Sequence, residues 1–416
     1  MFTNKPSAVK LALSAVAVTT SGALSSPPLQ TVPWNGHIGA VSFTFDDGLE
    51  NQATTLKAIL DTMPSVKVTF FIPGTSEFFR ANPESFVDLL LAGNEIANHS
   101  ESHEYLTNKS TDESFLQKEI LDFAEILENE LQKFPGASDY KVTAFATPYC
   151  ASDDNIRNTI GKKHFINRDC GDWGYRNAWD TEPQWFKFPA KTWTRSAGKV
   201  SDFIASLDTA ASKLDFSQMQ SWENIPDENG QWMVTLNHGV ALDNDEYSIN
   251  PDDISQIISH AVENKMWTAP FSTIAAYHMS HFAMDSATAT KDGDFYSVKW
   301  DLPSENMPSS IPLKVRLNAD FLEEISTGNA DSDSVNSLVI VQGNEVIFPD
   351  SNGIYTIEFT KLSLTIRKAT QEELKTSEDK PESIRKATRT EGPYIEKRNF
   401  FDLKGRRVKF QERKSL

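Results

Sequence analysis

The sequence predicts an α/β fold with a parallel sheet for its longer, N-terminal part, followed by a small antiparallel β-sandwich and a C-terminal tail. Between about residues 39 and 279, short apolar runs alternate with amphipathic stretches of helical spacing, which is the pattern of strand–helix–strand units. Beyond residue 283, apolar and polar side chains alternate in runs separated by Pro, Asn, Asp and Ser, as in antiparallel strands with one buried face. From the residues alone, the parallel sheet is either open or closed into a barrel.

Each element follows from its own run of residues. The run 66–72, Val-Lys-Val-Thr-Phe-Phe-Ile, has the β-branched and aromatic content of a strand, and 114–134 repeats apolar residues every three or four positions, as a helix face requires. The first domain, residues 38–282, contains predicted strands at 41–45, 66–72, 94–97, 142–146, 164–167 and 233–236, and predicted helices at 52–63, 83–92, 114–134, 154–161 and 251–265. The second domain, residues 291–366, contains predicted strands at 295–302, 311–318, 337–342 and 354–360.

The two ends of the chain have compositions of their own. Residues 1–23 combine two lysines, a short apolar run and small residues, which predicts a secretory signal peptide, with a disordered N-terminus as the alternative. Residues 367–398 are polar and aperiodic and are predicted to be a linker. Residues 399–416 contain Phe-Asp-Leu-Lys-Gly-Arg-Arg-Val and resemble the end of C-terminal sorting domains of type IX-like secretion, with a disordered tail as the alternative. We therefore expect a secreted or cell-surface protein.

Charge and cysteine content exclude several classes of protein. The formal net charge of −18 disfavours nucleic acid and anionic membranes as partners. No stretch after the N-terminus is long and apolar enough to be a transmembrane candidate. The two cysteines, Cys150 and Cys170, are too few for a zinc knuckle or a disulfide framework. We expect the chain to act as a monomer.

Two short motifs carry the chemistry. Thr-Phe-Asp-Asp-Gly at 44–48 ends a predicted strand and places the carboxylates of Asp46 and Asp47 side by side, where a glycine lets the backbone turn. His99 and His103 follow another predicted strand, and their spacing of four puts them on one face if that segment is helical. One carboxylate and two imidazoles make a metal site with open positions, and the second carboxylate remains for proton transfer. The pattern predicts metal-assisted hydrolysis.

On these residues the chain resembles the polysaccharide deacetylases with the NodB homology domain, carbohydrate esterase family 4, over about residues 38–280. Residues 44–48 match the first family motif in full, and residues 99–103 match the second, His-Ser/Thr-x-x-His. The resemblance implies a distorted (β/α)7 barrel in which Asp46 is the base and Asp47, His99 and His103 bind a divalent metal. Zinc is the expected ion, with cobalt or another divalent ion as alternatives.

The third family motif, Arg-x-Pro-Tyr, reads Ala-Thr-Pro-Tyr at 146–149, so its arginine is absent. The resemblance makes the backbone N–H of Tyr149 the donor to the oxyanion and places Pro148 beside the substrate. The fourth motif ends in Asp172 and Trp173. The resemblance implies that Asp172 orients the general acid and that Trp173 binds substrate.

The fifth family motif, Leu-x-His, reads Leu-Asn-His at 236–238. The resemblance makes His238 the general acid and Leu236 a substrate contact. Between Trp173 and Trp193 the chain is also rich in aromatic residues, which stack well on sugar rings but are more often core. We expect at least one of them to line the glycan cleft, and the alternative is that most of them belong to the core.

The family's arginine pairs with the base carboxylate, and Ala146 cannot replace it. Arg168 ends the strand predicted to neighbour the strand of Ala146, so its side chain could reach Asp46 and take over the role. Arg176 is a weaker candidate for this role. The alternative is that Arg168 pairs with Asp169 or another carboxylate instead.

The two cysteines lie just past the ends of two strands that we expect to be neighbours. Because secreted proteins favour oxidation, we predict a disulfide between Cys150 and Cys170. Closing this loop would contribute about 3 kcal/mol in the chain-entropy model. Two free buried thiols are the alternative.

The motifs together predict a secreted, metal-dependent hydrolase that removes acetyl groups from an acetylated polysaccharide, either N-acetyl groups of an amino-sugar polymer or O-acetyl groups of xylan. A water activated by the metal attacks the acetyl carbonyl, Asp46 takes its proton, and His238 protonates the leaving group. One alternative is a weak or inactive glycan-binding homologue that has lost the third-motif arginine. The other is a non-haem iron oxygenase, which would leave Asp46, Tyr149 and His238 without a role.

Overall fold

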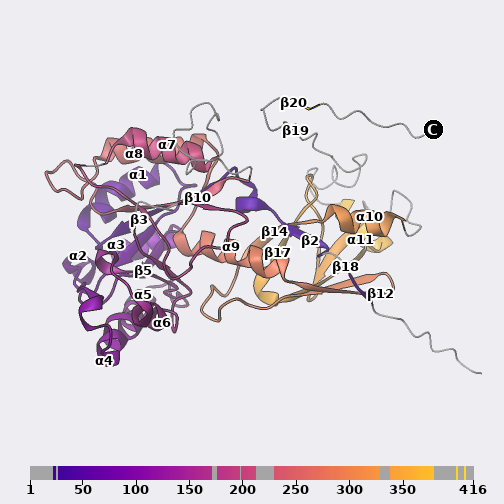
Figure 1. The fold of residues 1–416 in the computed structure, drawn as a ribbon, viewed down its shortest axis with the longest axis horizontal. Coiled ribbons are helices and arrows are strands. Elements are labelled where there is room, and N and C mark those ends of the chain that lie inside the picture. The colour runs from indigo at the N-terminus through magenta and orange to yellow at the C-terminus, as the bar shows by residue number, and fades with distance from the viewer. Residues whose placement is uncertain are drawn as a thin grey trace, which may run out of the picture.

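The computed structural model describes residues 22–24, 27–170, 176–196, 198–211, 229–327, 338–378, 400–401 and 407–408. These residues form two parts that lie side by side, with one long helix between them (Figure 1). One part is an α/β domain, and the other consists of antiparallel sheets. The fold class predicted from the sequence is therefore confirmed.

The α/β domain is built on a mainly parallel sheet whose order is β7-β6-β5-β4-β3-β10-β8. The six strands predicted from the sequence are all present as parallel neighbours: β3 (Ala40–Asp46), β4 (Thr69–Ile72), β5 (Glu95–Asn98), β6 (Ala144–Ala146), β7 (Ile166–Arg168) and β10 (Gln231–Asn237). Three short strands complete it: β8 (Arg176–Ala178), antiparallel to β10, β9 (Lys191–Thr192) and β11 (Trp267–Thr268). Every residue of the central strand β3 is buried.

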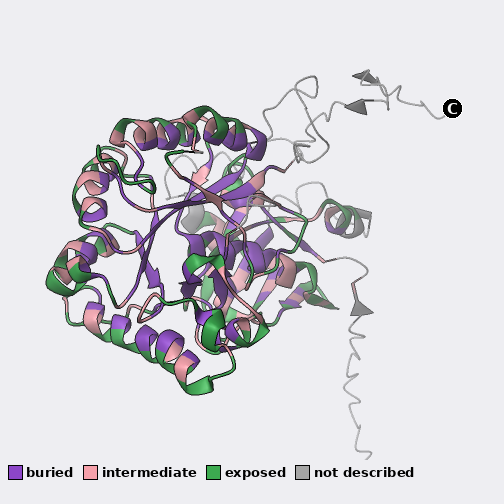
Figure 2. Ribbon diagram, turned by 60° about the vertical axis from the view of Figure 1, so that its left-hand side comes forward, coloured by how far each residue is buried: buried purple, intermediate pink, exposed green. Residues whose placement is uncertain are grey.

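Helices surround this sheet with their buried faces turned inward (Figure 2). The five predicted helices are present, and α2 and α7 were not predicted. Their bounds are α1 (Lys57–Asp61), α2 (Glu77–Ala81), α3 (Pro83–Leu91), α4 (Glu113–Leu116), α5 (Phe123–Gln132), α6 (Asp154–Ile160), α7 (Val200–Ala210) and α8 (Pro251–Glu263). Local sequence explains the helix starts: Pro83 occupies the first turn of α3, and the Asp153 side chain accepts the Ile156 N–H of α6.

Two of the predicted helices contain a π-helical turn. Gln52–Leu56 precedes α1, and Gln117–Asp122 connects α4 to α5. Such turns insert an extra residue into a helix and often occur at functional sites. Each of these two places a polar side chain against the candidate active site, as described below.

The second part is a β-sandwich, as predicted. One sheet has the order β1-β12-β13-β18-β15-β16, and the facing one has the order β17-β14-β2. Buried and exposed residues alternate along its strands, so the apolar side chains of the two sheets meet in one core. The bounds are β1 (Gly22–Ala23), β2 (Leu29–Thr31), β12 (Thr288–Asp292), β13 (Phe295–Lys299), β14 (Pro312–Leu317), β15 (Leu338–Gln342), β16 (Glu345–Ile347), β17 (Ile354–Glu358) and β18 (Ser363–Lys368), with helices α10 (Ala319–Thr327) and α11 (Gln371–Glu378).

Three features of the chain ends were not foreseen. The N-terminal strands β1 and β2 pair with β12 and β14 of the sandwich, so this part is built from both ends of the chain. Helix α11 lies within the segment 367–398 that was predicted to be an aperiodic linker. In the tail, β19 (Phe400–Phe401) and β20 (Arg407–Val408) pair with each other. Residues 1–21 and most of the tail lie outside the described residues, so the signal peptide and sorting tail remain predictions.

Helix α9 (Phe271–Asp285) joins the two parts, and most of its side chains are buried. It packs against β3 of the α/β domain and against β2 and β14 of the sandwich. The hydroxyl of Tyr277 donates a hydrogen bond of 2.7 Å to the carbonyl of Val32. Among the described residues, no helix combines the length and apolar character that a membrane span requires.

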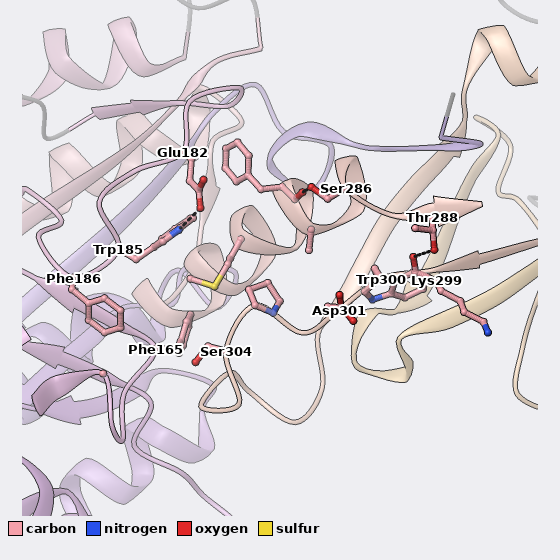
Figure 3. Close-up of a pocket in the computed structure, with 15 residues that line it drawn as sticks. Phe165, Glu182, Trp185, Phe186, Ser286, Thr288, Lys299, Trp300, Asp301 and Ser304 are labelled. Carbon is pink, nitrogen blue, oxygen red and sulfur yellow. Dashed lines mark hydrogen bonds between the residues drawn. The ribbon is translucent and has the colours of Figure 1, made fainter. Parts of the chain in front are cut away.

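A cavity of about 790 Å³ lies beside the C-terminal half of α9, between the two parts (Figure 3). Trp185 and Phe186 of the predicted aromatic run line this cavity. Trp179, Phe188 and Trp193 are buried in the core. The described aromatic residues between Trp173 and Trp193 therefore either pack in the core or line this cavity.

Candidate active site

The chemistry-bearing residues meet at the C-terminal ends of the parallel strands, as expected for this class of fold. Asp46 is the last residue of β3. The backbone then turns through left-handed conformations, with φ of 77° at Asp47 and 61° at Gly48. This turn brings the two adjacent carboxylates to one side, which regular strand geometry could not do. The turn expected at the glycine therefore begins one residue earlier.

The histidine segment is not helical, so the helical face expected for His99 and His103 is wrong. The two rings nevertheless lie together, with centroids 4.9 Å apart. They converge because the loop reverses through positive φ values at Ser100 (67°) and His103 (53°). The Ser100 hydroxyl accepts the backbone N–H of His103 and holds this reversal.

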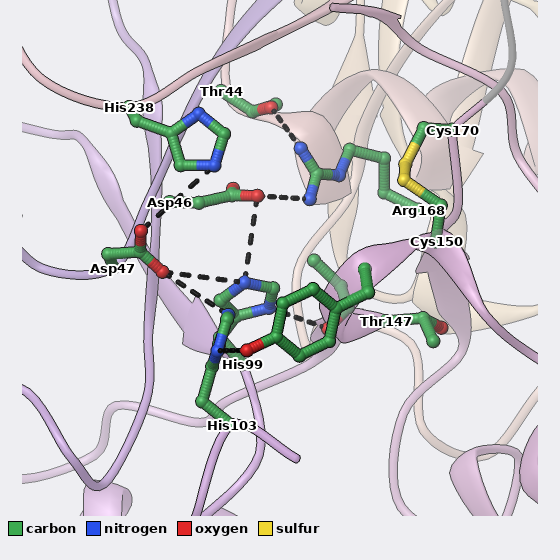
Figure 4. A network of polar contacts seen from close by, with 12 residues as sticks. Thr44, Asp46, Asp47, His99, His103, Thr147, Cys150, Arg168, Cys170 and His238 are labelled. Carbon is green, nitrogen blue, oxygen red and sulfur yellow. Dashed lines mark hydrogen bonds and ion pairs between the residues drawn. A yellow bond between two sulfur atoms is a disulfide. The ribbon is translucent and has the colours of Figure 1, made fainter. Parts of the chain in front are cut away.

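Asp47, His99 and His103 form a group whose potential ligand atoms lie within 4.8 Å of one another (Figure 4). The Oδ1 atom of Asp47 is 3.4 Å from Nε2 of His103 and 3.9 Å from Nε2 of His99. No other group of this kind occurs in the part of the chain that the structure describes. One carboxylate and two imidazoles with open positions are the donor set of a catalytic zinc site.

Hydrogen bonds on the far side of each ring prepare the imidazoles for a metal. Nδ1 of His99 is 2.8 Å from the carbonyl oxygen of Ala146. Because a carbonyl can only accept, Nδ1 carries the proton and the Nε2 lone pair faces Asp47. Burial lowers the pKa of His99 to about 3, so the ring stays neutral. Nδ1 of His103 is 3.2 Å from the hydroxyl of Tyr149. The residues present therefore fit a divalent ion.

Arg168 contacts Asp46, in the place predicted for it. Its Nη2 donates a 2.6 Å hydrogen bond to Oδ2 of Asp46, and its Nη1 donates to the Thr44 hydroxyl at 3.2 Å. Both partners of the ion pair are almost fully buried. Arg168 lies directly opposite Ala146 in the pairing of β6 with β7. The family motif would place an arginine at position 146 on β6. Here the guanidinium comes instead from Arg168, the residue paired with Ala146 on the neighbouring strand β7.

Burial and nearby charges shift the pKa values of Asp46 and Asp47 in opposite directions. Burial opposes ionisation of Asp46, but the charge and hydrogen bond of Arg168, together with the nearby His99 and His238, hold the pKa of Asp46 below its usual value. Burial, and then the negative charge of Asp46, raise the pKa of Asp47 to about 6. A cation beside Asp47 would relieve this repulsion. The Oδ1 atom of Asp46 is buried and has no hydrogen-bond partner among the described residues, which leaves it available to accept a proton.

The third-motif loop is tied to the end of β7 by a disulfide. Cys150 and Cys170 are bonded, with their Cα atoms 5.1 Å apart, so the predicted disulfide is confirmed. Pro148 is buried and opens a tight turn, in which Tyr149 and Cys150 have positive φ values of 55° and 60°. The disulfide joins the residue after Tyr149 to a residue two positions beyond Arg168.

His238 closes the other side of the site, after β10. Its Nε2 lies 4.0 Å from Oδ2 of Asp47 (Figure 4). Its Nδ1 is buried without a hydrogen-bond partner among the described residues. Asp172, the partner predicted for it, and Trp173 lie outside the described residues. Leu236 is 4% exposed and accepts the Trp193 N–H with its carbonyl, so its side chain belongs to the core.

Comparison with known proteins agrees with this geometry. Residues 35–165 match the family model of the polysaccharide deacetylases. This segment is similar to the polysaccharide deacetylases. The positions of the family's first three motifs all lie inside the matched segment.

Two curated deacetylases are similar to this chain. It is 34% identical over 157 residues to the peptidoglycan-N-acetylmuramic acid deacetylase PdaC of Bacillus subtilis, a match that covers 37% of this chain and 30% of PdaC. It is 32% identical over 173 residues to the peptidoglycan-N-acetylglucosamine deacetylase PgdA of Listeria monocytogenes, covering 41% of this chain and 34% of PgdA. The chain thus spans about a third of the length of these relatives.

Among solved structures, a family 4 acetyl xylan esterase from Clostridium thermocellum, in complex with a cobalt ion, is 19% identical. The similarity covers 56% of this chain and 89% of that chain, with a TM-score of 0.34.

Two side chains that support the candidate active site were missed by the sequence reasoning, and both come from the π-helical turns. Gln52 donates its Nε2 protons to the carbonyls of Asp46 (2.5 Å) and His238 (3.1 Å), tying together the loops after β3 and β10. Glu119 is 1% exposed and accepts from both the N–H and the hydroxyl of Ser102, within the histidine loop. In sequence both residues read as ordinary polar positions of amphipathic helices.

The Arg176 alternative finds no support in the described contacts, since Arg168 already occupies the position beside Asp46. Asp169, the other partner considered for Arg168, instead accepts from the Ser152 hydroxyl at 2.7 Å. The contact between Arg168 and Asp46 is thus present as predicted, while its part in catalysis remains a proposal.

The α/β domain is expected to bind one divalent ion through its group Asp47, His99 and His103. The His99→Ala variant should lose at least about 100-fold in affinity for zinc. Mutating a residue that only hydrogen-bonds a metal ligand lowers metal affinity by about 10–100-fold, and removing the ligand itself should cost no less. Isothermal titration of the metal-stripped protein measures this. The control is His260→Ala, because His260 pairs with Asp208 on the outer helices and its loss should not change zinc binding. Equal zinc affinity of His99→Ala and the unaltered protein would contradict the site.

Proposed function

We propose that this protein is a secreted, metal-dependent hydrolase that removes acetyl groups from a polysaccharide. The observation that carries the proposal is the pairing of Asp46 with Arg168 directly beside the group Asp47, His99 and His103. A buried carboxylate that is kept ionised next to a metal site is placed to act as a general base. Zinc is the metal we propose, with cobalt or another divalent ion as alternatives.

Each residue has a distinct part in the proposed reaction. A divalent ion at Asp47, His99 and His103 would supply Lewis acidity toward the acetyl oxygen and the attacking water. Asp46 accepts the proton of that water at Oδ1, while Arg168 keeps Asp46 ionised. His238 donates a proton to the departing amine or alcohol. The backbone N–H of Tyr149 is the proposed donor to the oxyanion.

The class of glycan is proposed by analogy with the relatives. Two of them are named as peptidoglycan deacetylases, acting on N-acetylmuramic acid and N-acetylglucosamine. Amide and ester bonds to acetate break through the same tetrahedral intermediate. The substrate we propose is therefore an acetylated polysaccharide, with N-acetyl groups of peptidoglycan or a related amino-sugar polymer first and O-acetyl groups of xylan second.

The two alternatives are less well supported by the geometry. A homologue that merely binds glycans has no need for a buried charge on Asp46, yet Arg168 supplies what the third motif lacks. An iron oxygenase would use the two histidines and one carboxylate but would leave Asp46, Arg168 and His238 without a task. Export and surface attachment remain proposals that rest on residues 1–23 and 399–416.

Acetate release from acetylated glycans tests the proposal. We expect the protein to release acetate from N-acetylglucosamine oligomers, peptidoglycan fragments or acetylated xylan. A chelator should abolish the release, and zinc or cobalt should restore it. Binding of these glycans without acetate release would favour the glycan-binding alternative. Oxygen uptake with iron would favour the oxygenase.

A further inference from the structure

Three tyrosines with half of their surface exposed stand around the row of catalytic groups. Tyr105 and Tyr149 are each 49% exposed, and Tyr247 is 50% exposed. Isolated exposed aromatic residues are unremarkable, but these three all lie beside one reaction centre. Flat aromatic side chains at a cleft commonly bind ligands with an apolar face.

At one end of the row, Tyr105 stacks on Tyr149. Their ring centroids are 4.0 Å apart and their planes differ by 8°. The ring of Tyr149 is in turn 4.8 Å from that of His103, a proposed metal ligand. Because Tyr149 covers one face of Tyr105, the exposed surface of Tyr105 includes its outer face. An aromatic platform therefore extends outward from the metal site.

At the other end of the row, Tyr247 lies beside His238, with ring centroids 5.0 Å apart. His238 is itself 4.0 Å from Asp47, measured from Nε2 to Oδ2. The order across the site is thus Tyr105 and Tyr149, the metal group, His238 and then Tyr247. An exposed aromatic ring flanks the reacting groups on each side.

The backbone around each of the two aromatic platforms, the pair Tyr105 and Tyr149 on one side and Tyr247 on the other, is held by contacts within the protein. The N–H of Tyr247 bonds to Oδ1 of Asp245 at 2.8 Å, and the neighbouring Glu246 accepts the backbone N–H groups of Arg195 and Ser196. On the other side, the residue after Tyr105, Leu106, is fully buried. Because the backbone that carries each ring is already held, less entropy is lost there when a ligand binds.

We infer that Tyr105 and Tyr247 are sugar-stacking residues on opposite sides of the metal group, and that the preferred substrate is a glycan chain with at least one sugar on each side of the acetylated unit. The C–H face of a pyranose ring is apolar and matches an exposed tyrosine ring, while the sugar hydroxyls stay in water. A monosaccharide could occupy the metal site but could not reach both platforms. The inference rests on the proposed function and specifies its substrate as an internal unit of a polymer.

Acetate release from a series of N-acetylglucosamine oligomers, from one to six units, tests the inference. For the unaltered protein, kcat/KM should rise with length until both platforms are covered. Tyr105→Ala and Tyr247→Ala should each raise KM for the hexamer about tenfold, the effect of losing one well-placed aromatic contact, with kcat changed much less. The loss should shrink as the substrate shortens, and Tyr105→Trp should restore the hexamer value. Phe295→Ala, which removes a ring that is 51% exposed on the β-sandwich, is the matched control.

Binding of the hexamer gives a readout that needs no turnover. Calorimetry should show about tenfold weaker hexamer binding for Tyr105→Ala than for the unaltered protein, with equal thermal unfolding temperatures as the check on folding. If both tyrosine variants act on and bind the hexamer as the unaltered protein does, the inference is wrong although the proposed function stands. If the unaltered protein binds the hexamer through these tyrosines but releases no acetate, the proposed function is wrong instead.

Discussion

Replacing Asp46 by asparagine is expected to lower the rate of acetate release by about 10²–10⁴-fold, the usual contribution of a positioned general base. Asparagine preserves the shape of the side chain and can still accept the hydrogen bond from Arg168, but it cannot take a proton from water. Acetate release under saturating substrate measures the effect. Zinc binding should remain, because Asp46 is not one of the three proposed ligands.

The control for this variant is Asp61→Asn, which makes the same chemical change at an exposed ion pair with Lys57. Its rate should match that of the unaltered protein. Asp46→Asn leaves the buried Arg168 without a charged partner, and breaking a buried pair costs about 3–5 kcal/mol, so folding must be checked by thermal unfolding. A folded Asp46→Asn protein with an undiminished rate would remove Asp46 from the mechanism.

The Arg168→Ala variant is expected to shift the acid limb of the activity profile upward by roughly 1–3 pH units, the effect of an opposite charge within a few ångströms. Burial raises the pKa of Asp46, and Arg168 is the largest of the contributions that lower it below the usual value. Without Arg168, only the weaker contributions of His99 and His238 oppose burial, and the pKa rises. Asp46 is then protonated, and inactive as a base, at pH values where the unaltered enzyme still works. The pH dependence of kcat/KM measures this shift.

A second substitution can separate the charge effect from damage to the fold. Ala146 and Arg168 are paired neighbours on β6 and β7, so the double variant Ala146→Arg/Arg168→Ala returns the guanidinium from the strand that carries it in the family motif. It should bring the acid limb back toward its original position. Zinc affinity should stay near that of the unaltered protein in both variants. An unchanged pH profile in Arg168→Ala would instead strengthen the inactive-homologue alternative.

Local sequence patterns predicted the parallel sheet well because its six main strands are short and almost wholly buried, and because β3, β4 and β10 are rich in β-branched and aromatic residues. The strand ends then located Asp46, Asp47 and both histidines at one edge of the sheet. The same reasoning anticipated the contact between Arg168 and Asp46, because residues that end neighbouring parallel strands lie at the same level. These predictions needed only the alternation of strands and helices along the chain, which implies a parallel sheet, and the length of an arginine side chain.

Features that depend on distant partners could not be predicted in this way. Strand β2 has no periodicity long enough to be recognised, and it becomes a strand only because β14, far along the chain, offers an edge. The histidine loop has helical spacing but a loop conformation, since Glu119 and the positive φ at Ser100 set its path. Gln52 acts on the site only through a π-helical turn, which leaves no signature in the hydrophobic pattern.

The disulfide between Cys150 and Cys170 makes the state of the active site depend on where the protein is. It braces the loop of Tyr149 against the end of the strand that carries Arg168, two parts that contact the proposed metal ligands and the base. In a reducing compartment these thiols would stay reduced, and the two loops would lack their covalent tie. A reduced chain would therefore hold these two parts of the site by non-covalent contacts alone, and oxidation would join them covalently.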